Sequence, residues 1–126
     1  MIHIDEEREG RQGFPEVVYG QGKSVAQLES ICETYLSRKL PLLITRMKPE
    51  HWEPVRRIFN ASKGWKLDDE EARCFAWRPA TSPRPRRKGR VNCICAGSSD
   101  AAVILEAQRT LDFFGVESRL IADVGV

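Results

Sequence analysis

Residues 97–100, GlySerSerAsp, have the types and spacing of an anion-binding turn at the beginning of a helix. In a strand–turn–helix arrangement, Gly97, Ser98 and Ser99 present backbone N–H groups and hydroxyls to a phosphate, and the helix dipole favours the anion. The carboxylate of Asp100 repels a phosphate at close range but accepts hydrogen bonds from ribose hydroxyls. A nucleotide therefore fits this turn better than a bare phosphate does.

The same residues also have an ordinary structural interpretation. Serine and aspartate are preferred N-cap residues, which stabilise a helix by about 0.5–2 kcal/mol without any ligand. The spacing matches neither the GxxxxGK[S/T] phosphate loop nor the GxGxxG dinucleotide loop, so it does not indicate an ATPase or an ordinary dinucleotide oxidoreductase. Spacing alone leaves both a nucleotide site and a simple helix cap open.

A β–α–β unit is predicted to position this turn. A β-like apolar run covers 90–96, a helix runs from about Asp100 to Phe114, and a second strand covers 117–122. Gly115 lies where a helix C-cap belongs. The two strands of such a unit are expected to be parallel. The apolar residues predicted on one face of this helix are Ile104, Ala107, Leu111 and Phe114.

A second α/β unit is predicted over residues 1–78. In chain order its elements are a strand at 17–19, a helix at about 25–38, a strand at 42–45, a helix that starts at Pro49 and is stopped by Gly64, and a strand at 73–77. Ser24 and Gln27 have capping-box spacing before the first helix. This β-α-β-α-β order indicates a small α/β unit. The aromatic residues expected in its core are Trp52, Phe59, Trp65, Phe75 and Trp77.

A basic, proline-rich segment at 79–89 is predicted to link the two units. Residues 78–90 hold six of the 20 basic residues and none of the 18 acidic ones, so this segment accounts for the net charge of +2. Three prolines make it extended, and no aromatic residue is interleaved to stack on bases. We therefore favour a solvated connection and expect no nucleic-acid partner.

The four cysteines have no CxxC spacing and are predicted to be reduced core residues: Cys32, Cys74, Cys93 and Cys95. Only His3 and His51 are available to complete a zinc site, so no metal site is predicted. The chain has neither an apolar run of the ~20 residues that a membrane span requires nor a signal-peptide pattern. We therefore expect a cytoplasmic protein.

Two groups of motifs resemble one enzyme family. ArgValAsnCysIleCysAlaGlySerSerAsp at 90–100 and AspValGlyVal at 123–126 resemble the start of the PurE-like aminoimidazole ribonucleotide (AIR) carboxylase domain. The resemblance is to the LarB branch, the pyridinium-3,5-biscarboxylic acid mononucleotide synthases. GlyPheProGlu at 13–16 and the GlyGlnGlyLys at 20–23 resemble the leader that precedes this domain in LarB. The sequence departs from the family pattern at Ala102 and Leu105, where a proline and an acidic residue are usual.

The resemblance implies an α/β fold in which the N-terminal α/β unit is joined by the basic linker to the first βαβ of a flavodoxin-like (PurE-like) parallel sheet. The sheet is incomplete in 90–126, and the family's reactive cysteine is expected beyond residue 126. No catalytic residue, metal ligand or tightly bound cofactor is therefore expected in this chain, which is expected to be inactive alone. Gly97, Ser98, Ser99 and Asp100 are the implied nucleotide-binding residues.

The family's activity is carboxylation of the pyridinium ring of nicotinic acid adenine dinucleotide and hydrolysis of its phosphoanhydride. This reaction belongs to the biosynthesis of the nickel-pincer cofactor of lactate racemase. The resemblance implies CO2 or bicarbonate and Mg²⁺ as requirements of the intact enzyme, and a homo-oligomeric assembly.

Five charged residues of the N-terminal unit are candidates for a rim that contacts the dinucleotide or a neighbouring subunit: Arg8, Arg11, Glu16, Lys23 and Arg46. Structural ion pairing within the unit is the alternative for them.

Two other functions stay open. The first is a PurE-type aminoimidazole ribonucleotide carboxylase or mutase of purine synthesis, which the GSSD spacing and the GFPE leader disfavour. The second is a noncatalytic nucleotide- or nucleic-acid-binding module.

Overall fold

The computed structural model describes residues 17–95 and 101–122, which form a mixed α/β fold with two sheets. The first sheet has the order β1-β2-β4-β3, with β1 (Val17–Tyr19), β2 (Leu42–Thr45), β3 (Trp65–Asp69) and β4 (Cys74–Arg78). The second pairs β5 (Arg90–Cys95) with β6 (Glu117–Ala122). The helices are α2 (Val25–Arg38), α3 (Trp52–Phe59) after a short 3-10 turn η1 (Pro49–His51), and α4 (Ala101–Phe113). Within the described residues, no helix has the length and apolar character to span a membrane.

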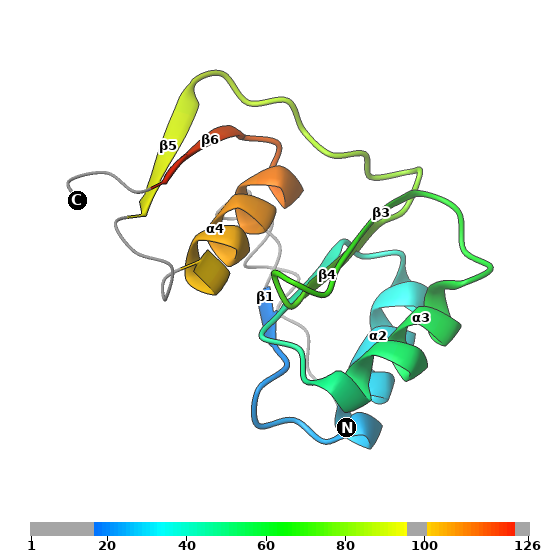
Figure 1. The fold of residues 1–126 in the computed structure, drawn as a ribbon. Helices are drawn as coiled ribbons and strands as arrows, with labels where there is room; N and C mark the ends of the chain where they lie inside the picture. The colour runs from blue at the N-terminus through cyan, green and yellow to red at the C-terminus, as the bar shows by residue number, and fades with distance from the viewer. Residues whose placement is uncertain (1–16, 96–100, 123–126) are drawn as a thin grey trace.

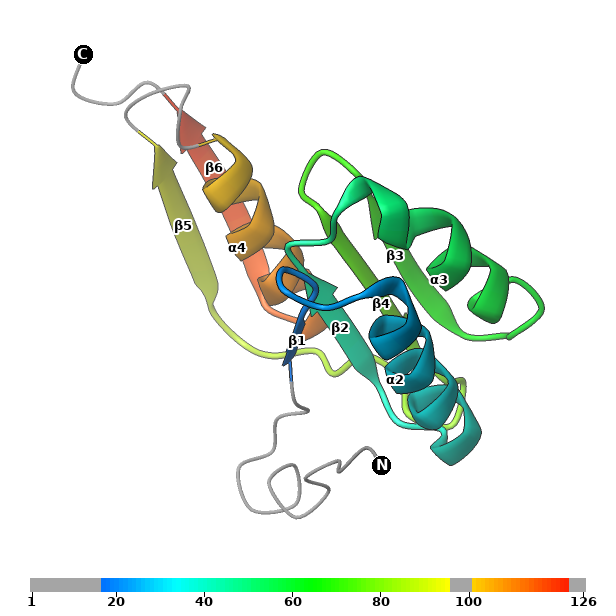
Figure 2. The same cartoon turned by 90° about the horizontal axis from the view of Figure 1, so that it is seen from below.

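The elements stack in four layers. Helices α2 and α3 cover one face of the four-stranded sheet, and α4 lies against its other face (Figures 1 and 2). The β5–β6 pair lies on the far side of α4. Helix α4 of the βαβ unit contacts strands of both sheets. The βαβ unit therefore packs against the N-terminal unit through α4.

Helix α2 begins and ends where the sequence predicts. The Ser24 hydroxyl accepts a hydrogen bond from Gln27 N (3.1 Å), and Gln27 Oε1 accepts one from Ser24 N (2.9 Å). This reciprocal pair satisfies two backbone donors that a helix start leaves without partners. Lys39 ends the helix in the left-handed conformation, with φ 55°. The predicted helix at 25–38 is confirmed.

The main core lies between the four-stranded sheet and helices α2 and α3. The central strands β2 and β4 are buried along their whole length, so they contribute apolar side chains to both faces of the sheet. Phe59 of α3 packs against Phe75 and Trp77 of β4, with ring centroids 5.4 and 5.2 Å away. The prediction of a core position is confirmed for these three and for Trp52, whereas Trp65 is half-buried.

The predicted β-α-β-α-β order misses one strand. Strand β3, TrpLysLeuAspAsp, pairs antiparallel with β4, which itself runs antiparallel to β2. Its two aspartates disfavour strand on intrinsic propensity, so the sequence signal was weak. The sheet is consequently mixed, because only β1 and β2 are parallel.

The second predicted helix differs at both ends. Its first turn from Pro49 is a 3-10 turn, and α3 ends at Phe59, so the prediction that it continues to Gly64 is wrong. The Phe59 carbonyl accepts hydrogen bonds from the Ser62 hydroxyl (2.7 Å) and from Lys66 Nζ (2.6 Å). These side chains replace the partners that a continuing helix would supply.

The βαβ unit is confirmed. Strands β5 and β6 are parallel, with Cys93 opposite Leu120, and Gly115 follows α4 with φ 77°. The predicted apolar face of α4 is only partly buried, because Ile104, Leu111 and Phe114 are half-buried and Ala107 is exposed. Phe113, which lay outside the predicted apolar face, is fully buried and packs against Leu43 and Ala76 of the four-stranded sheet.

Three arginines of residues 78–87 bind the carboxyl end of α4, and we call them the arginine strap. Arg78 Nε donates to Phe113 O (3.1 Å), Arg84 Nη1 to Asp112 O (3.1 Å), and Arg87 Nε to Phe114 O (2.9 Å). The final carbonyls of a helix lack intrahelical partners and attract cations. The segment is therefore fastened to α4 at these residues, which differs from the solvated connection expected from sequence.

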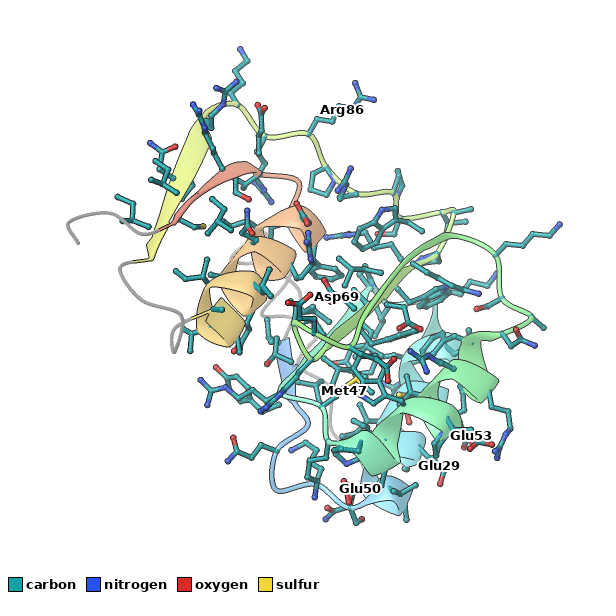
Figure 3. The ribbon with its side chains drawn as sticks, in the orientation of Figure 1. Glu29, Met47, Glu50, Glu53, Asp69 and Arg86 are labelled. Atoms are coloured by element: carbon teal, nitrogen blue, oxygen red, sulfur yellow. The ribbon has the colours of Figure 1, made fainter. Side chains whose placement is uncertain are left out.

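The same segment keeps one of its cations in solvent. Arg86 is exposed, and its side chain points away from the rest of the protein (Figure 3). Among the arginines of 78–87, Arg78, Arg84 and Arg87 thus bind the helix end, whereas Arg86 points into solvent.

Candidate functional site

A cleft of about 630 Å³ opens between the N-terminal unit and the first turns of α4. Its walls come from the chain after β2, the turn between β3 and β4, and α4. Met47, labelled in Figure 3, is a buried lining residue in the chain after β2. The lining residues that matter below are Arg46, Met47, Lys48, Trp52, Glu70, Arg73, Val103 and Glu106.

The turn at Gly20 to Lys23 is held against the end of β2. Gly20 N donates to Thr45 O (2.7 Å), and Lys23 N donates to Gly20 O (3.0 Å). A Cβ at Gly20 would lie 3.0 Å from Arg46 O and 3.1 Å from the Met47 Cα. The absence of a side chain at Gly20 therefore allows the close approach of the two backbone segments. This contact gives a physical reason for the first glycine of the GlyGlnGlyLys motif.

His51 joins this turn to the wall of the cleft. The side chain is fully buried, its Nδ1 accepts a hydrogen bond from Lys48 N (3.0 Å), and its Nε2 lies 2.9 Å from Lys23 O. These partners assign the neutral tautomer with the proton on Nε2, which donates to the carbonyl. His51 thus has a positioning role, because it fixes the backbone at both Lys23 and Lys48.

Three cationic residues line the cleft, and two of them have no carboxylate partner among the residues that the structure describes. Arg46 Nε lies 3.6 Å from Glu106 Oε1, and its guanidinium lies 5.4 Å from the centre of the Tyr19 ring. Lys48 and Arg73 form no ion pair within the described part of the chain. The site therefore presents positive charge that the protein's own described acids do not neutralise.

The two carboxylates of the cleft are already engaged. Glu70 Oε2 lies 3.4 Å from Arg56 Nη2, on the side of the turn that faces α3, and Glu106 faces Arg46. Neither is therefore placed to act as a free general base. An arrangement of this kind can bind an anion, but it supplies no nucleophile.

Of the rim residues predicted from sequence, Arg46 lines the cleft, and Lys23 contributes its carbonyl to the His51 contact. Arg8, Arg11 and Glu16 lie outside the described residues, as do the predicted nucleotide-binding residues Gly97, Ser98, Ser99 and Asp100.

The elements that flank the predicted nucleotide turn are described. β5 ends at Cys95 and α4 begins at Ala101, and Ala102 and Val103 of the first turn of α4 line the cleft. Sequence reasoning missed Lys48 and Arg73, because neither belongs to a recognisable motif. Lys48 lies two residues after Arg46, and the fold brings Arg73 to the same cleft.

Three of the four cysteines have side chains that the structure describes, and these are core residues, whereas the side chain of Cys95 lies outside the described part. Cys32, Cys74 and Cys93 are free thiols and buried, which confirms the prediction for them. Burial raises the pKa of Cys32 and of Cys74 to about 12, so both stay protonated at neutral pH. Because the thiolate is the nucleophilic form, neither of these two is suited to covalent catalysis.

An ion-pair network joins the β3–β4 turn to α4 below the cleft. Arg109 Nε donates to Asp69 Oδ2 (2.8 Å), and Asp69 Oδ1 accepts from Ala72 N (3.0 Å). Burial of Asp69 opposes its ionisation, but the hydrogen bonds from Ala72 and Arg109 outweigh burial and lower the pKa of this carboxyl. Asp69, labelled in Figure 3, thus fixes the turn that carries Glu70 and Arg73.

The lowered pKa of Asp69 predicts acid-sensitive stability. A group with a folded-state pKa below its unfolded value of about 3.9 stabilises the fold fully above that value. The stabilisation is lost as the pH falls through the folded pKa. We expect Asp69→Asn to be less stable at pH 7 and to lose less stability than the wild type on acidification below about pH 4. Urea unfolding over this range measures both, and equal pH slopes would contradict the assignment.

No group of three His, Cys, Asp or Glu side chains within the described residues is arranged to hold a metal ion. The Mg²⁺ expected from the resemblance therefore has no ligand set among them.

The fold and the cleft define a mixed α/β protein with a cationic site between two packed units. Residues 1–79 match the family described as the LarB/PurE-like N-terminal domain, which is more than half of the chain, and the chain belongs to this family. An uncharacterized protein of Methanocaldococcus jannaschii is 26% identical over 130 residues, which cover 99% of this chain and 49% of the relative. The chain thus spans about half the length of that curated relative. The predicted resemblance to a LarB/PurE-like N-terminal portion is confirmed.

Proposed function

We propose that this chain is the N-terminal part of a LarB-like enzyme. The enzyme carboxylates the pyridinium ring of nicotinic acid adenine dinucleotide and hydrolyses its phosphoanhydride, in the biosynthesis of the nickel-pincer cofactor of lactate racemase. The observation that carries the proposal is the family membership of residues 1–79. The GFPE leader together with the GSSD and DVGV motifs favours the LarB branch over the purine branch.

The βαβ unit supports a nucleotide site at its predicted position. The GlySerSerAsp motif connects the carboxyl end of β5 to the amino end of α4. In open α/β sheets, ligands bind outside the carboxyl ends of the strands, where the amino ends of helices favour anions. In the proposed enzyme, β5 and β6 are the first strands of a flavodoxin-like sheet.

The proposed reaction requires a nucleophile and an anion site. A cysteine thiolate adds to the electron-poor pyridinium ring, and the resulting enamine-like carbon attacks CO2. Loss of the ring proton and of the thiolate then restores the aromatic ring. Water cleaves the phosphoanhydride, which releases AMP and the dicarboxylated pyridinium mononucleotide.

This chain would contribute binding and positioning to that reaction. The described thiols are buried, so the thiolate is assigned to a part of the enzyme other than these residues. No step is assigned to a metal ion held by the described residues. Lys23 and Arg46, on the turn and the wall of the cleft, belong to the proposed dinucleotide-binding rim.

The test is turnover by the protein made from the whole reading frame that contains this chain. It is incubated with nicotinic acid adenine dinucleotide, bicarbonate and Mg²⁺, and the products are followed by mass spectrometry. We expect AMP and a pyridinium mononucleotide that carries one more carboxyl group than the nicotinate half of the substrate. With labelled bicarbonate, ¹³C should appear in that mononucleotide. Conversion of aminoimidazole ribonucleotide without turnover of the dinucleotide would instead assign the protein to the purine branch.

A further inference from the structure

We propose that the cleft between the N-terminal unit and α4 binds a pyrophosphate group, with Arg46, Lys48 and Arg73 as its cationic contacts. The choice of a nucleotide pyrophosphate as the natural ligand rests on the proposed function. The site itself rests on residues of this chain, and its binding of an anion is measurable whether or not the enzyme reaction is the one proposed.

The charges of the cleft favour a ligand with more than one negative charge. Lys48 and Arg73 have no ion-pair partner in the described part of the chain. Arg46 has one, but its Nε lies 3.6 Å from Glu106 Oε1, which is long for an ion pair. Cations that converge on a concave surface concentrate anions there, and charge-assisted hydrogen bonds to phosphate are stronger than neutral ones. A diphosphate has more charge and more acceptor oxygens than a single carboxylate, so it is better suited to contact three cations.

The backbone is shaped to bring the two arginines to one rim. Arg46 and Arg73 both have left-handed φ angles, of 55° and 59°, and Met47 N donates to Arg73 O (3.0 Å). A non-glycine residue in this region costs about 1 kcal/mol or more, and such strain persists only where the surrounding structure imposes it. The link through Met47 therefore fixes Arg46 and Arg73 relative to each other before any ligand binds.

The size and floor of the cleft indicate a ligand larger than inorganic phosphate. Sites for small molecules typically have volumes of about 300–1,000 Å³, and this cleft has about 630 Å³. Val103 is exposed and adds apolar surface beside the three cations, and the largely buried Met47 and Trp52 line the cleft next to it. A pyrophosphate joined to a ring-bearing group uses both features, as in a nucleotide.

Glu106 provides an internal competitor. Its carboxylate faces Arg46 from α4, so an anion in the cleft must share or displace this pair. Removing the charge with Glu106→Gln should strengthen pyrophosphate binding. A gain in affinity is informative, because misfolding or general destabilisation does not produce one.

The experiment is calorimetric titration of the 126-residue chain with inorganic pyrophosphate at low ionic strength. We expect Lys48→Gln and Arg73→Gln each to raise the dissociation constant about fivefold or more, as loss of a charge-assisted contact predicts. Glu106→Gln should lower it. Arg57→Gln is the matched control, because it removes one positive charge on α3 at an exposed residue paired with Glu53. We expect it to change the constant by less than about twofold, as screening of distant charges predicts.

The outcomes separate the two proposals. The anion site would be overturned if the chain did not bind pyrophosphate, or if Arg57→Gln weakened binding as much as Lys48→Gln does. It would also be overturned if Glu106→Gln left the affinity for pyrophosphate unchanged or lowered it. Binding of pyrophosphate with the expected pattern of variants, in a protein whose full reading frame does not turn over the nicotinate dinucleotide, would uphold the anion site and refute the proposed function.

Discussion

Replacing Gly115 with alanine should lower the free energy of unfolding by about 3 kcal/mol or more. Gly115 has φ 77°, where an L side chain is strained by about 1–2 kcal/mol. In addition, a Cβ here would overlap the carbonyl oxygen of Pro85, so the segment that carries the arginine strap must move. That movement would break the 3.0 Å hydrogen bond from Arg87 N to Gly115 O.

Gly89→Ala is the matched control for this prediction. Gly89 also has a left-handed φ of 96°, but a Cβ at this position would meet no atom within 4 Å. Its replacement should therefore cost only the conformational penalty of about 1 kcal/mol. Urea unfolding followed by tryptophan fluorescence measures both variants. Equal losses in the two would mean that the contact between Gly115 and the strap does not stabilise the protein.

The arginine strap gives the basic segment a structural role, because it attaches the segment to the end of α4. Its arginines bind the carbonyls at the carboxyl end of α4, while the amino end of the same helix lines the cleft. A helix fixed at one end is fixed at the other, because it is rigid over its 13 residues. The position of Glu106 relative to Arg46 therefore depends on contacts at the opposite end of α4.

Elements defined by local signals could be predicted from the sequence. Helix α2 has its capping box and its helical spacing of apolar residues, and β5, α4 and β6 have apolar runs separated by a turn and by Gly115. These signals lie within a few residues of one another. Local physics thus sufficed for the boundaries of α2 and α4 and for the parallel β5–β6 pair, but not for those of α3.

Features that depend on distant contacts could not be predicted. Strand β3 contains two aspartates, and it forms because β4 offers a neighbouring edge. Phe113 lies off the predicted apolar face of α4, yet the four-stranded sheet buries it. The cationic cleft was missed for the same reason, since Arg73 is distant in sequence from Arg46 and Lys48 and only the fold brings it to them.

Phe113→Ala is expected to have an equally large effect, a loss of about 3–5 kcal/mol. The ring is fully buried between α4 and the four-stranded sheet, where it packs against Leu43 and Ala76. It also lies under the guanidinium of Arg78, 4.3 Å from the ring centre. Truncation leaves a cavity and removes the aromatic partner of a buried cation, so two contributions are lost together.

The two faces of the four-stranded sheet are stabilised by different aromatic residues, so Phe113→Ala should destabilise a different face than Phe59→Ala. Phe59→Ala should cost a similar amount, because Phe59 is also buried, but its partners Phe75 and Trp77 lie on the face covered by α2 and α3. Hydrogen exchange separates the two variants. Phe113→Ala should raise amide exchange in α4 and β6 more than in α2, and Phe59→Ala should do the reverse. If Phe113→Ala exposed α2 as much as α4, the two faces of the sheet would unfold as one unit, and α4 would not respond independently to contacts in the cleft.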